Sequence, residues 1–147
     1  MPKAESSVRA WADLPMLVNQ DHPKLYQKQL VLPEDADKIQ AALHAVLFER
    51  LGCGGAVLPH DHDCCEIICI IKGEVEAYYQ GDWHHQKAGD TLLIPAGEIH
   101  SVYNRQEESE QISIFLPVNT SEKNRMFVTR IFETIALPAK DRKEKPV

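Results

Sequence analysis

The 147-residue sequence has no long apolar run. Its first twenty residues mix short apolar patches with proline and charged residues, which is typical of neither a signal peptide nor a membrane anchor. We therefore expect a cytoplasmic protein with no membrane partner. Internal repeats and low-complexity segments are also lacking, and the length suits one domain with a buried core. We accordingly expect a single domain over residues 1–147.

Positive charge is scarce as well. The formal net charge is −6, and Lys and Arg form no stripe with interleaved aromatic residues. The basic cluster at residues 140–145 also contains two acidic residues. This composition disfavours a nucleic-acid partner, because a nucleic-acid interface needs a concentrated positive surface. A small molecule is the expected partner.

Cysteine occurs only in one central segment, and its spacing lacks the paired CxxC arrangement of many zinc sites. The four residues are Cys53, Cys64, Cys65 and Cys69. Adjacent cysteines would form a strained bridge, and thiols stay reduced in the cytosol. We interpret all four as small, mostly buried side chains on strands. The alternative is that one thiol lies near a metal.

Short apolar segments separated by Gly and Pro dominate residues 28–118. Such evenly spaced strands are typical of an antiparallel barrel or jelly roll. Residues 106–110 form a polar loop, and Gly73 divides a longer apolar stretch into two strands or one bent strand. The strands are expected at residues 28–32, 44–51, 56–62, 66–79, 91–94, 100–104 and 111–118.

The two ends of the chain have a different pattern. Residues 1–27 are expected to form an N-terminal arm that packs on the barrel, and residues 34–43 a short helix. Residues 119–147 are expected to contain a C-terminal helix followed by a tail. The apolar stripe that predicts this helix consists of Phe127, Val128, Ile131, Phe132 and Ile135. Its β-branched content leaves a strand open as the alternative.

Three potential metal ligands lie close together in the segment from Gly54 to Gly73. They are His60, His62 and Glu66. On a strand, residues two apart point to the same face, so both imidazoles would point one way while the intervening Asp61 points the other. Glu66 reaches the same interior only if the chain bends after the histidines. Imidazoles and carboxylates bind divalent metals, so this cluster predicts part of a metal site.

Two spaced motifs in this chain resemble those of the cupin superfamily. The first reads G-x5-H-x-H-x3-E-x6-G and the second G-x5-P-x-G-x2-H-x3-N. The matching positions are Gly54, His60, His62, Glu66 and Gly73 within residues 54–73, and Gly89, Pro95, Gly97, His100 and Asn104 within residues 89–104. The resemblance covers residues 44–118 and does not extend to either end of the chain.

The resemblance implies a mainly β fold, the cupin jelly roll or double-stranded β-helix barrel. In that family, the positions equivalent to His60, His62, Glu66 and His100 hold one metal ion, so His100 is the implied fourth ligand. One divalent transition metal per chain is the expected cofactor. Fe²⁺ is favoured, and Mn²⁺, Ni²⁺, Zn²⁺ and Cu²⁺ remain open because this ligand set suits all of them.

Chemistry at such a site usually needs a proton-transferring side chain nearby. The candidates flank the predicted hairpin turn at residues 80–83, and they are Tyr78, Tyr79, His84 and His85. Neighbours on a strand face opposite sides, so one tyrosine and at most one histidine can face the interior. The sequence leaves open which ones do.

The same alternation makes predictions for the strands that carry the metal ligands. Ile68 and Ile70 share the face of Glu66, which predicts an apolar pocket floor suited to a substrate with a chelating head and an apolar body. Tyr103 alternates with His100 and is expected to point outward into packing.

The resemblance favours an enzyme but does not name its reaction, because the cupin fold hosts many reactions and also sugar-binding modules. We favour a mononuclear oxygenase or dioxygenase acting on a small, metal-chelating organic molecule. A metal-dependent isomerase or lyase is the first alternative, and a non-catalytic small-molecule sensor is the second. The arm at residues 1–27 and the stripe at residues 127–135 offer apolar surface, so a homodimer is also expected.

Overall fold

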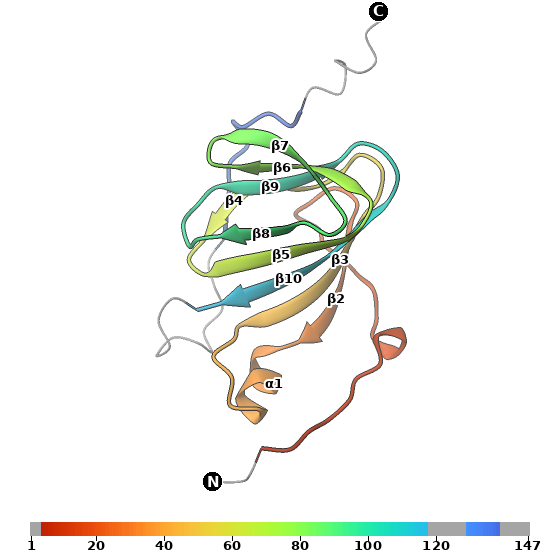
Figure 1. Ribbon diagram of the computed structural model, residues 1–147, viewed down its shortest axis with the longest axis vertical. Coiled ribbons are helices and arrows are strands. Elements are labelled where there is room, and N and C mark those ends of the chain that lie inside the picture. Colours follow the sequence, from red (N-terminus) through yellow and green to blue (C-terminus); the bar gives the residue numbers. More distant parts are fainter. Residues whose placement is uncertain (1–3, 118–128, 139–147) are drawn as a thin grey trace, which may run out of the picture.

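Two antiparallel sheets enclose the interior of the molecule (Figure 1). The computed structural model describes residues 4–117 and 129–138. One sheet has the strand order β1-β2-β3-β10-β5-β8, and the other has the order β11-β4-β9-β6-β7. The strands are β1 (Leu17–Val18), β2 (Leu25–Val31), β3 (Ala45–Leu51), β4 (Gly55–His62), β5 (Cys65–Lys72), β6 (Glu74–Tyr79), β7 (Asp82–Lys87), β8 (Thr91–Ile94), β9 (His100–Asn104), β10 (Ser109–Leu116) and β11 (Thr129–Ile131).

Alternating burial along the strands builds the core. On β5, Glu66, Ile68 and Ile70 are buried while the residues between them are only partly covered. This confirms the predicted inward face of β5. The apolar core comes from both sheets and consists of Leu25, Leu51, Ile68, Ile70, Val75, Ala77, Leu92, Ile94 and Val102. The expected mainly β jelly roll is therefore confirmed.

Two tight turns set the order of the strands. Gly73 has a φ of 86° between β5 and β6, and a Cβ there would lie 3.0 Å from the carbonyl oxygen of Glu108. Only glycine fits both the left-handed backbone and the close approach. Gln80 and Gly81 also have positive φ values, as the two-residue turn of the β6–β7 hairpin requires. Of the two alternatives that the sequence left open for residues 66–79, the structure has two separate strands divided at Gly73.

The described helices are short. One is a 3-10 turn, η1 (Trp11–Asp13), and the other is α1 (Pro33–Lys38). The helix expected over residues 34–43 therefore ends earlier than predicted. Gln40 adopts a φ of 61°, which terminates the helical path before β3 begins.

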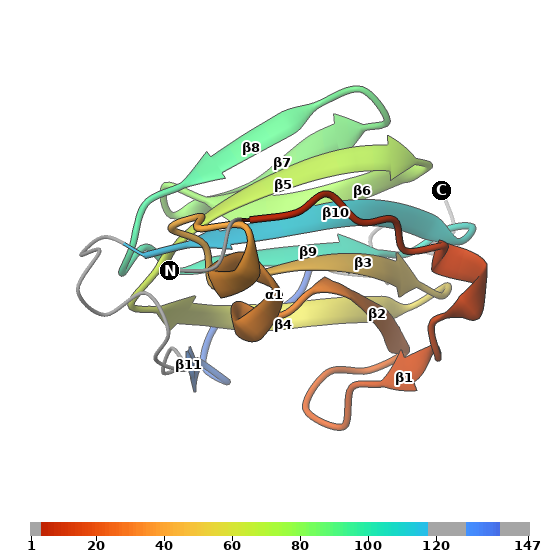
Figure 2. The same cartoon turned by 90° about the horizontal axis from the view of Figure 1, so that it is seen from below.

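The N-terminal arm lies against the outer side of β2 and β3, where it crosses the view of Figure 2. The Trp11 ring contacts Phe48 with 5.6 Å between centroids, and an Arg9 guanidinium nitrogen donates to the Leu30 carbonyl oxygen at 2.8 Å. The arm is shorter than the expected 1–27, because β1 and the first residues of β2 already belong to the sheet. Similarly, β10 begins at Ser109, inside the predicted polar loop at 106–110.

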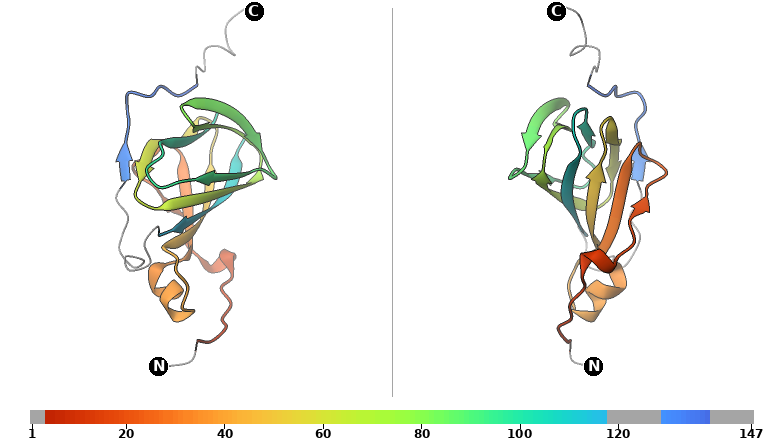
Figure 3. Two further views of the ribbon diagram at one scale, coloured as in Figure 1. Left: turned by 60° about the vertical axis from the view of Figure 1, so that its left-hand side comes forward. Right: turned by 90° about the vertical axis from the view of Figure 1, so that its right-hand side faces the viewer.

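The C-terminal helix is the clearest error of the sequence-based prediction. Residues 129–131 form β11, which pairs with the ligand-bearing end of β4, and turns follow to residue 138 (Figure 3). The β-branched residues at 128, 129 and 131 favour this extended pairing over a helix. The other residues of the predicted segment 119–147 lie outside the described part. Among the described residues, no helix is long and apolar enough to span a membrane.

Candidate metal centre

The chain passes from one sheet to the other between the two halves of the first motif. His60 and His62 end β4 in one sheet, and Glu66 lies near the start of β5 in the other. The bend at Asp63 and Cys64 makes this crossing, and it supplies the change of direction that the sequence required. The two histidines and the glutamate therefore face the interior from opposite walls.

His100 reaches the same point from β9. In the sheet register it lies directly opposite His60. The turn at Pro95–Gly97 precedes β9, and the N–H of Gly97 donates to the carbonyl oxygen of His62 at 2.8 Å. The second motif thus contacts the first through the backbone as well as through side chains.

The four side chains converge. Their potential ligand atoms all lie within 4.8 Å of one another, and all four residues are buried. Nε2 of His62 and Nε2 of His100 each lie 2.9 Å from Oε1 of Glu66, and the rings of His60 and His100 have centroids 4.2 Å apart. The cluster could therefore hold one ion.

Each histidine ring is oriented by a backbone carbonyl two residues away. Nδ1 of His60, His62 and His100 lies 2.7, 2.9 and 2.8 Å from the carbonyl oxygens of Leu58, Cys64 and Glu98, respectively. With Nδ1–H donating outward, Nε2 is the nitrogen that faces the cluster. Metal-binding histidines use this arrangement because it fixes both the tautomer and the direction of the lone pair.

The charges of the cluster also suit a cation. Burial and, to a smaller extent, the charge of the nearby His100 lower the pKa of His60 to about 3, so His60 is neutral. Burial by itself would raise the pKa of Glu66, but hydrogen bonds from His100 and His62 and the charges of these rings bring it well below its ordinary value. Burial lowers the pKa of His100, yet its hydrogen bond to the Glu66 carboxylate raises that pKa overall. A carboxylate and three oriented imidazoles fit a divalent transition metal.

The β6–β7 hairpin separates the four proton-transfer candidates into two pairs. Tyr79 packs against the apolar core, and its ring stacks on that of His84 at 4.0 Å between centroids. Tyr79 shares the inward face of β6 with the buried Val75 and Ala77. Tyr78 pairs with Ser101 in the β6–β9 register, so Tyr79 and His100 are the next opposed residues.

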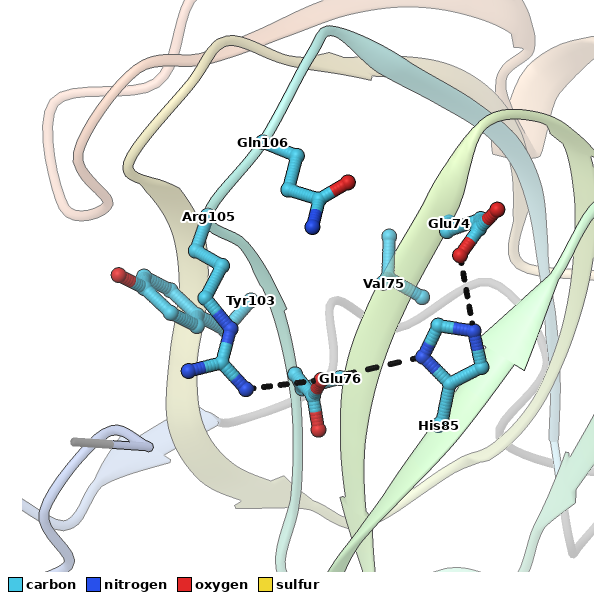
Figure 4. A pocket seen from close by; sticks show the side chains of 7 residues that line it. All are labelled: Glu74, Val75, Glu76, His85, Tyr103, Arg105 and Gln106. Carbon is cyan, nitrogen blue, oxygen red and sulfur yellow. Dashed lines mark hydrogen bonds and ion pairs between the residues drawn. The ribbon is translucent and has the colours of Figure 1, made fainter. Parts of the chain in front are cut away.

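Tyr78 and His85 lie on the outer face of this hairpin. The Tyr78 ring contacts Trp83 rather than any metal-ligand candidate. His85 is more than half exposed and lies 3.0 Å from Glu74 and 3.8 Å from Glu76, in a shallow outer pocket that Tyr103 and Arg105 also line (Figure 4). The outer location of Tyr78 and His85 argues against a role for either residue at the metal cluster. Tyr103 is buried on this side, as expected from its alternation with His100.

The cysteines do not join the cluster. Cys64 is the only fully buried one of the four, and burial raises the pKa of its thiol to about 12, whereas a metal-bound cysteine must be a thiolate. Its Sγ lies 3.6 Å from Nδ1 of His62, behind the ring edge that faces the cluster. The four thiols are free, as predicted. The prediction that all four are buried on strands is wrong: Cys53 is exposed in a turn, Cys64 is buried in a bend, and Cys65 and Cys69 lie on β5 but are only partly buried.

Two further residues near the cluster have no counterpart in the motifs. His22 accepts a hydrogen bond from the Leu58 N–H, and its ring lies 5.8 Å from that of His60. Glu49 is buried among Gln27, Gln111 and Ser113. The sequence signal for Glu49 was an acidic residue within the β-rich segment 44–51, but its inward direction depends on a strand register that the sequence did not define.

Solved structures share this fold. A predicted oxalate decarboxylase from Thermotoga maritima has a TM-score of 0.68 at 22% identity, covering 76% of this chain and 100% of that one. The polyketide cyclase RemF from Streptomyces resistomycificus has a TM-score of 0.67 at 15% identity, covering 76% and 80%. An RmlC-like cupin from Shewanella frigidimarina NCIMB 400 has a TM-score of 0.64 at 14% identity, covering 78% and 94%. The chain has the jelly-roll barrel fold of these cupins.

Sequence comparisons address the central part of this chain. The model of the AraC-like ligand binding domain matches residues 56–115, a segment that includes all four potential metal ligands. A protein of Aquifex aeolicus (strain VF5), described as uncharacterized, is 34% identical over 61 residues. That match covers 41% of this chain and only half of the relative's length.

Proposed function

We propose that this cupin is a metal-dependent enzyme that oxygenates a small organic molecule able to chelate its metal. His60, His62, Glu66 and His100 are the proposed ligands, and Fe²⁺ is the favoured ion. The single observation that carries the proposal is the convergence of three Nε2 atoms and one carboxylate in a buried cluster, with each Nδ1 directed to a backbone carbonyl. When bound, such an ion would supply Lewis acidity and, if it is iron, a redox partner for oxygen.

The surrounding residues would exclude water and hold the substrate body. Phe115 pairs with Glu66 across β10 and β5, and its ring contacts that of His62 at 5.7 Å between centroids. Ile94 pairs with Glu66 on the other side. Both are buried, so the wall beside the cluster is apolar and suits a substrate with an apolar body.

Tyr79 and His84 are the proposed proton-transfer residues. The Tyr79 hydroxyl donates to Oε1 of Gln86 at 2.7 Å, which leaves its oxygen lone pairs available to accept a hydrogen bond from a substrate. If this hydroxyl transfers a proton, Tyr79→Phe lowers turnover by a factor of about 10² or more. Tyr78→Phe, the same change on the outer face, leaves turnover unaltered.

The reaction class is tested by metal analysis followed by turnover with and without air. Elemental analysis of protein purified without added metal identifies the ion. The Fe²⁺-loaded protein is then given a panel of small chelating acids, ketones and phenols in an oxygen electrode. Oxygen consumed in proportion to substrate supports the oxygenase. Equal turnover under argon rejects it and favours Lewis-acid chemistry.

A ligand-binding sensor is the second candidate, favoured by the AraC-like ligand binding model that matches residues 56–115. A sensor would bind a panel molecule without converting it. His60→Ala separates the two candidates further, with His85→Ala as its control on the outer face. If His60→Ala loses the metal yet binds and converts the molecule normally, the metal-dependent enzyme is rejected.

A further inference from the structure

A second carboxyl group lies inside the barrel. Glu49 on β3 is 4% exposed, although it belongs to neither cupin motif. It pairs with Gln111 of β10 on one side and with Gln27 of β2 on the other. Carboxylates are rarely buried to this extent without a charged partner, so its surroundings require an explanation.

The hydrogen-bond partners of Glu49 are all neutral. Gln111 Nε2 and Ser113 Oγ donate to Oε1 at 2.9 and 2.8 Å, and Gln27 Nε2 donates to Oε2 at 2.6 Å. No Lys, Arg or His in the described residues forms an ion pair with it. A carboxylate has about four acceptor positions, so three donors leave one position on Oε2.

Glu49 faces the same interior as the metal cluster. Ser113, which binds Glu49, is followed on the inward face of β10 by Phe115, the pair partner of Glu66. Burial raises the pKa of Glu49, and the negative charge of Glu66 raises it further, while the three donors partly oppose the rise. The interior therefore contains two carboxyl groups, and only Glu66 contacts imidazoles.

Resting on the proposed function, we propose that Glu49 binds a hydroxyl or protonated amine of the same molecule that the metal cluster chelates. Such a donor occupies the remaining acceptor position on Oε2. A protonated amine also offsets the uncompensated negative charge. The substrate class is thus narrowed to molecules with a chelating head at one end and a hydrogen-bond donor on the body.

A structural role for Glu49 makes a different prediction. Its hydrogen bonds link β2 to β10 across β3, so a purely structural carboxyl would affect stability and would influence every ligand alike. A ligand-binding carboxyl instead discriminates between ligands that carry a donor and ligands that do not. Buried charges are seldom optimal for stability, so replacing Glu49 by its amide need not unfold the barrel.

The test uses Co²⁺-loaded protein, whose visible absorption reports ligand binding at the metal. The probes are 3-hydroxy-4-pyridinones, which chelate the metal through their two oxygen atoms. Each probe carries one substituent, a methyl, hydroxymethyl or aminomethyl group, and the series places it at each free ring position in turn. Dissociation constants are measured for the wild type, Glu49→Gln and Glu49→Asp. Glu110→Gln is the matched control, because Glu110 also lies on a neighbouring strand but pairs with Arg50 on the outer side.

At one ring position or more, the wild type binds a donor-bearing probe about tenfold or more tightly than its methyl counterpart. The aminomethyl and hydroxymethyl arms show which donor is preferred. The ratio of the dissociation constants of the methyl probe and the donor-bearing probe measures this preference. Glu49→Gln reduces the ratio to about three or less and keeps the affinity for Co²⁺ and for the methyl probe. Glu49→Asp, with a retracted carboxylate, gives an intermediate ratio, and Glu110→Gln keeps the full ratio.

Two results overturn the inference. The first is that the wild type binds the methyl and the donor-bearing probes equally, whichever ring position carries the group. The second is that Glu49→Gln keeps the same preference for donor-bearing probes as the wild type. If Glu49→Gln fails to fold by circular dichroism, the ratio for Glu49→Asp decides, and a full wild-type ratio there rejects the inference. If the wild type does not bind Co²⁺, the proposed function is rejected, and this inference with it. If the wild type binds Co²⁺ and the methyl probe but shows no preference for a donor, only the role of Glu49 is rejected.

Discussion

Arg130 forms a two-pronged ion pair with Asp61, the residue between His60 and His62. Its Nε and Nη2 lie 3.0 and 2.6 Å from the two carboxylate oxygens. In the register of β11 and β4, Arg130 is opposite Asp61, and the flanking residues of β11 are opposite the two histidines. Because Asp61 points away from the metal cluster, this pair stabilises the ligand-bearing strand from behind.

Removing this ion pair is expected to weaken metal binding without abolishing it. Arg130→Gln should raise the dissociation constant for Zn²⁺ by about threefold to tenfold, somewhat less than the loss of a partner that contacts a ligand directly. Competition with a chromophoric chelator measures the constant. Arg9→Gln, which breaks the equally two-pronged pair with Asp35 on the arm, is the control and should leave it unchanged. Equal Zn²⁺ affinity in both variants would contradict the role of β11.

Loss of one proposed ligand should have a larger effect. His100→Ala removes one of the two imidazoles that contact Glu66, so we expect Zn²⁺ affinity to fall by about 100-fold or more. Isothermal titration calorimetry gives the stoichiometry, which should be one ion per chain for the wild type. His85→Ala removes an exposed imidazole from the outer face and should behave as the wild type. Retention of tight binding by His100→Ala would show that the ion lies elsewhere.

The buried carboxyl of Glu49 predicts a pH-dependent difference in stability. Burial and the charge of Glu66 raise its pKa in the folded protein above the ordinary value of a glutamate, so the folded state holds its proton at pH values where the unfolded state has lost it. Stability contributed by this group is therefore complete below about pH 4.5 and declines as pH rises toward the folded pKa. Gln27, Gln111 and Ser113 do not titrate in this range.

Urea unfolding of metal-free protein measures this effect. The stability of Glu49→Gln relative to the wild type should increase as pH rises from about 4 to 8, because the amide has no proton to lose. Glu110→Gln corrects for the general effect of removing a carboxylate. A difference between Glu49→Gln and the wild type that stays constant over this pH range would contradict the raised pKa.

The homodimer remains a prediction, and the structure offers a surface on which to test it. Leu93, Ile67 and Ile114 are neighbours on the outer face of β8, β5 and β10, and Leu93 is 73% exposed. Light scattering should give twice the chain mass of 16.6 kDa for the wild type. Leu93→Glu should yield the single-chain mass, whereas Ile39→Glu, at an exposed apolar residue beside α1, should remain dimeric.

Residue spacing predicted the barrel and three of the four members of the cluster, because these depend on local rules. Alternation placed His60 and His62 on one face, and the positive φ at Gly73 required the residue type found there. His100 was identified only through the resemblance, since nothing in the local sequence indicates that β9 lies beside β4.

The features that the sequence did not reveal depend on pairing between distant segments. The apolar stripe at residues 127–135 is compatible with a helix or a strand, and contact with β4 decides in favour of the strand at residues 129–131. Tyr78 and Tyr79 could not be separated until the register of β6 placed Ala77 and Val75 in the core. Glu49 was overlooked for the same reason, because burial of an acidic side chain has no local signature.

The proposed ligands come from both walls of the barrel, three from β4 and β9 and one from β5. An ion held by all four would be a cross-link between the two layers, so its removal would loosen their mutual packing as well as stop any chemistry. Chelating agents used during purification would then act as mild denaturants. The melting temperature would rank candidate ions by how firmly each one ties the layers together.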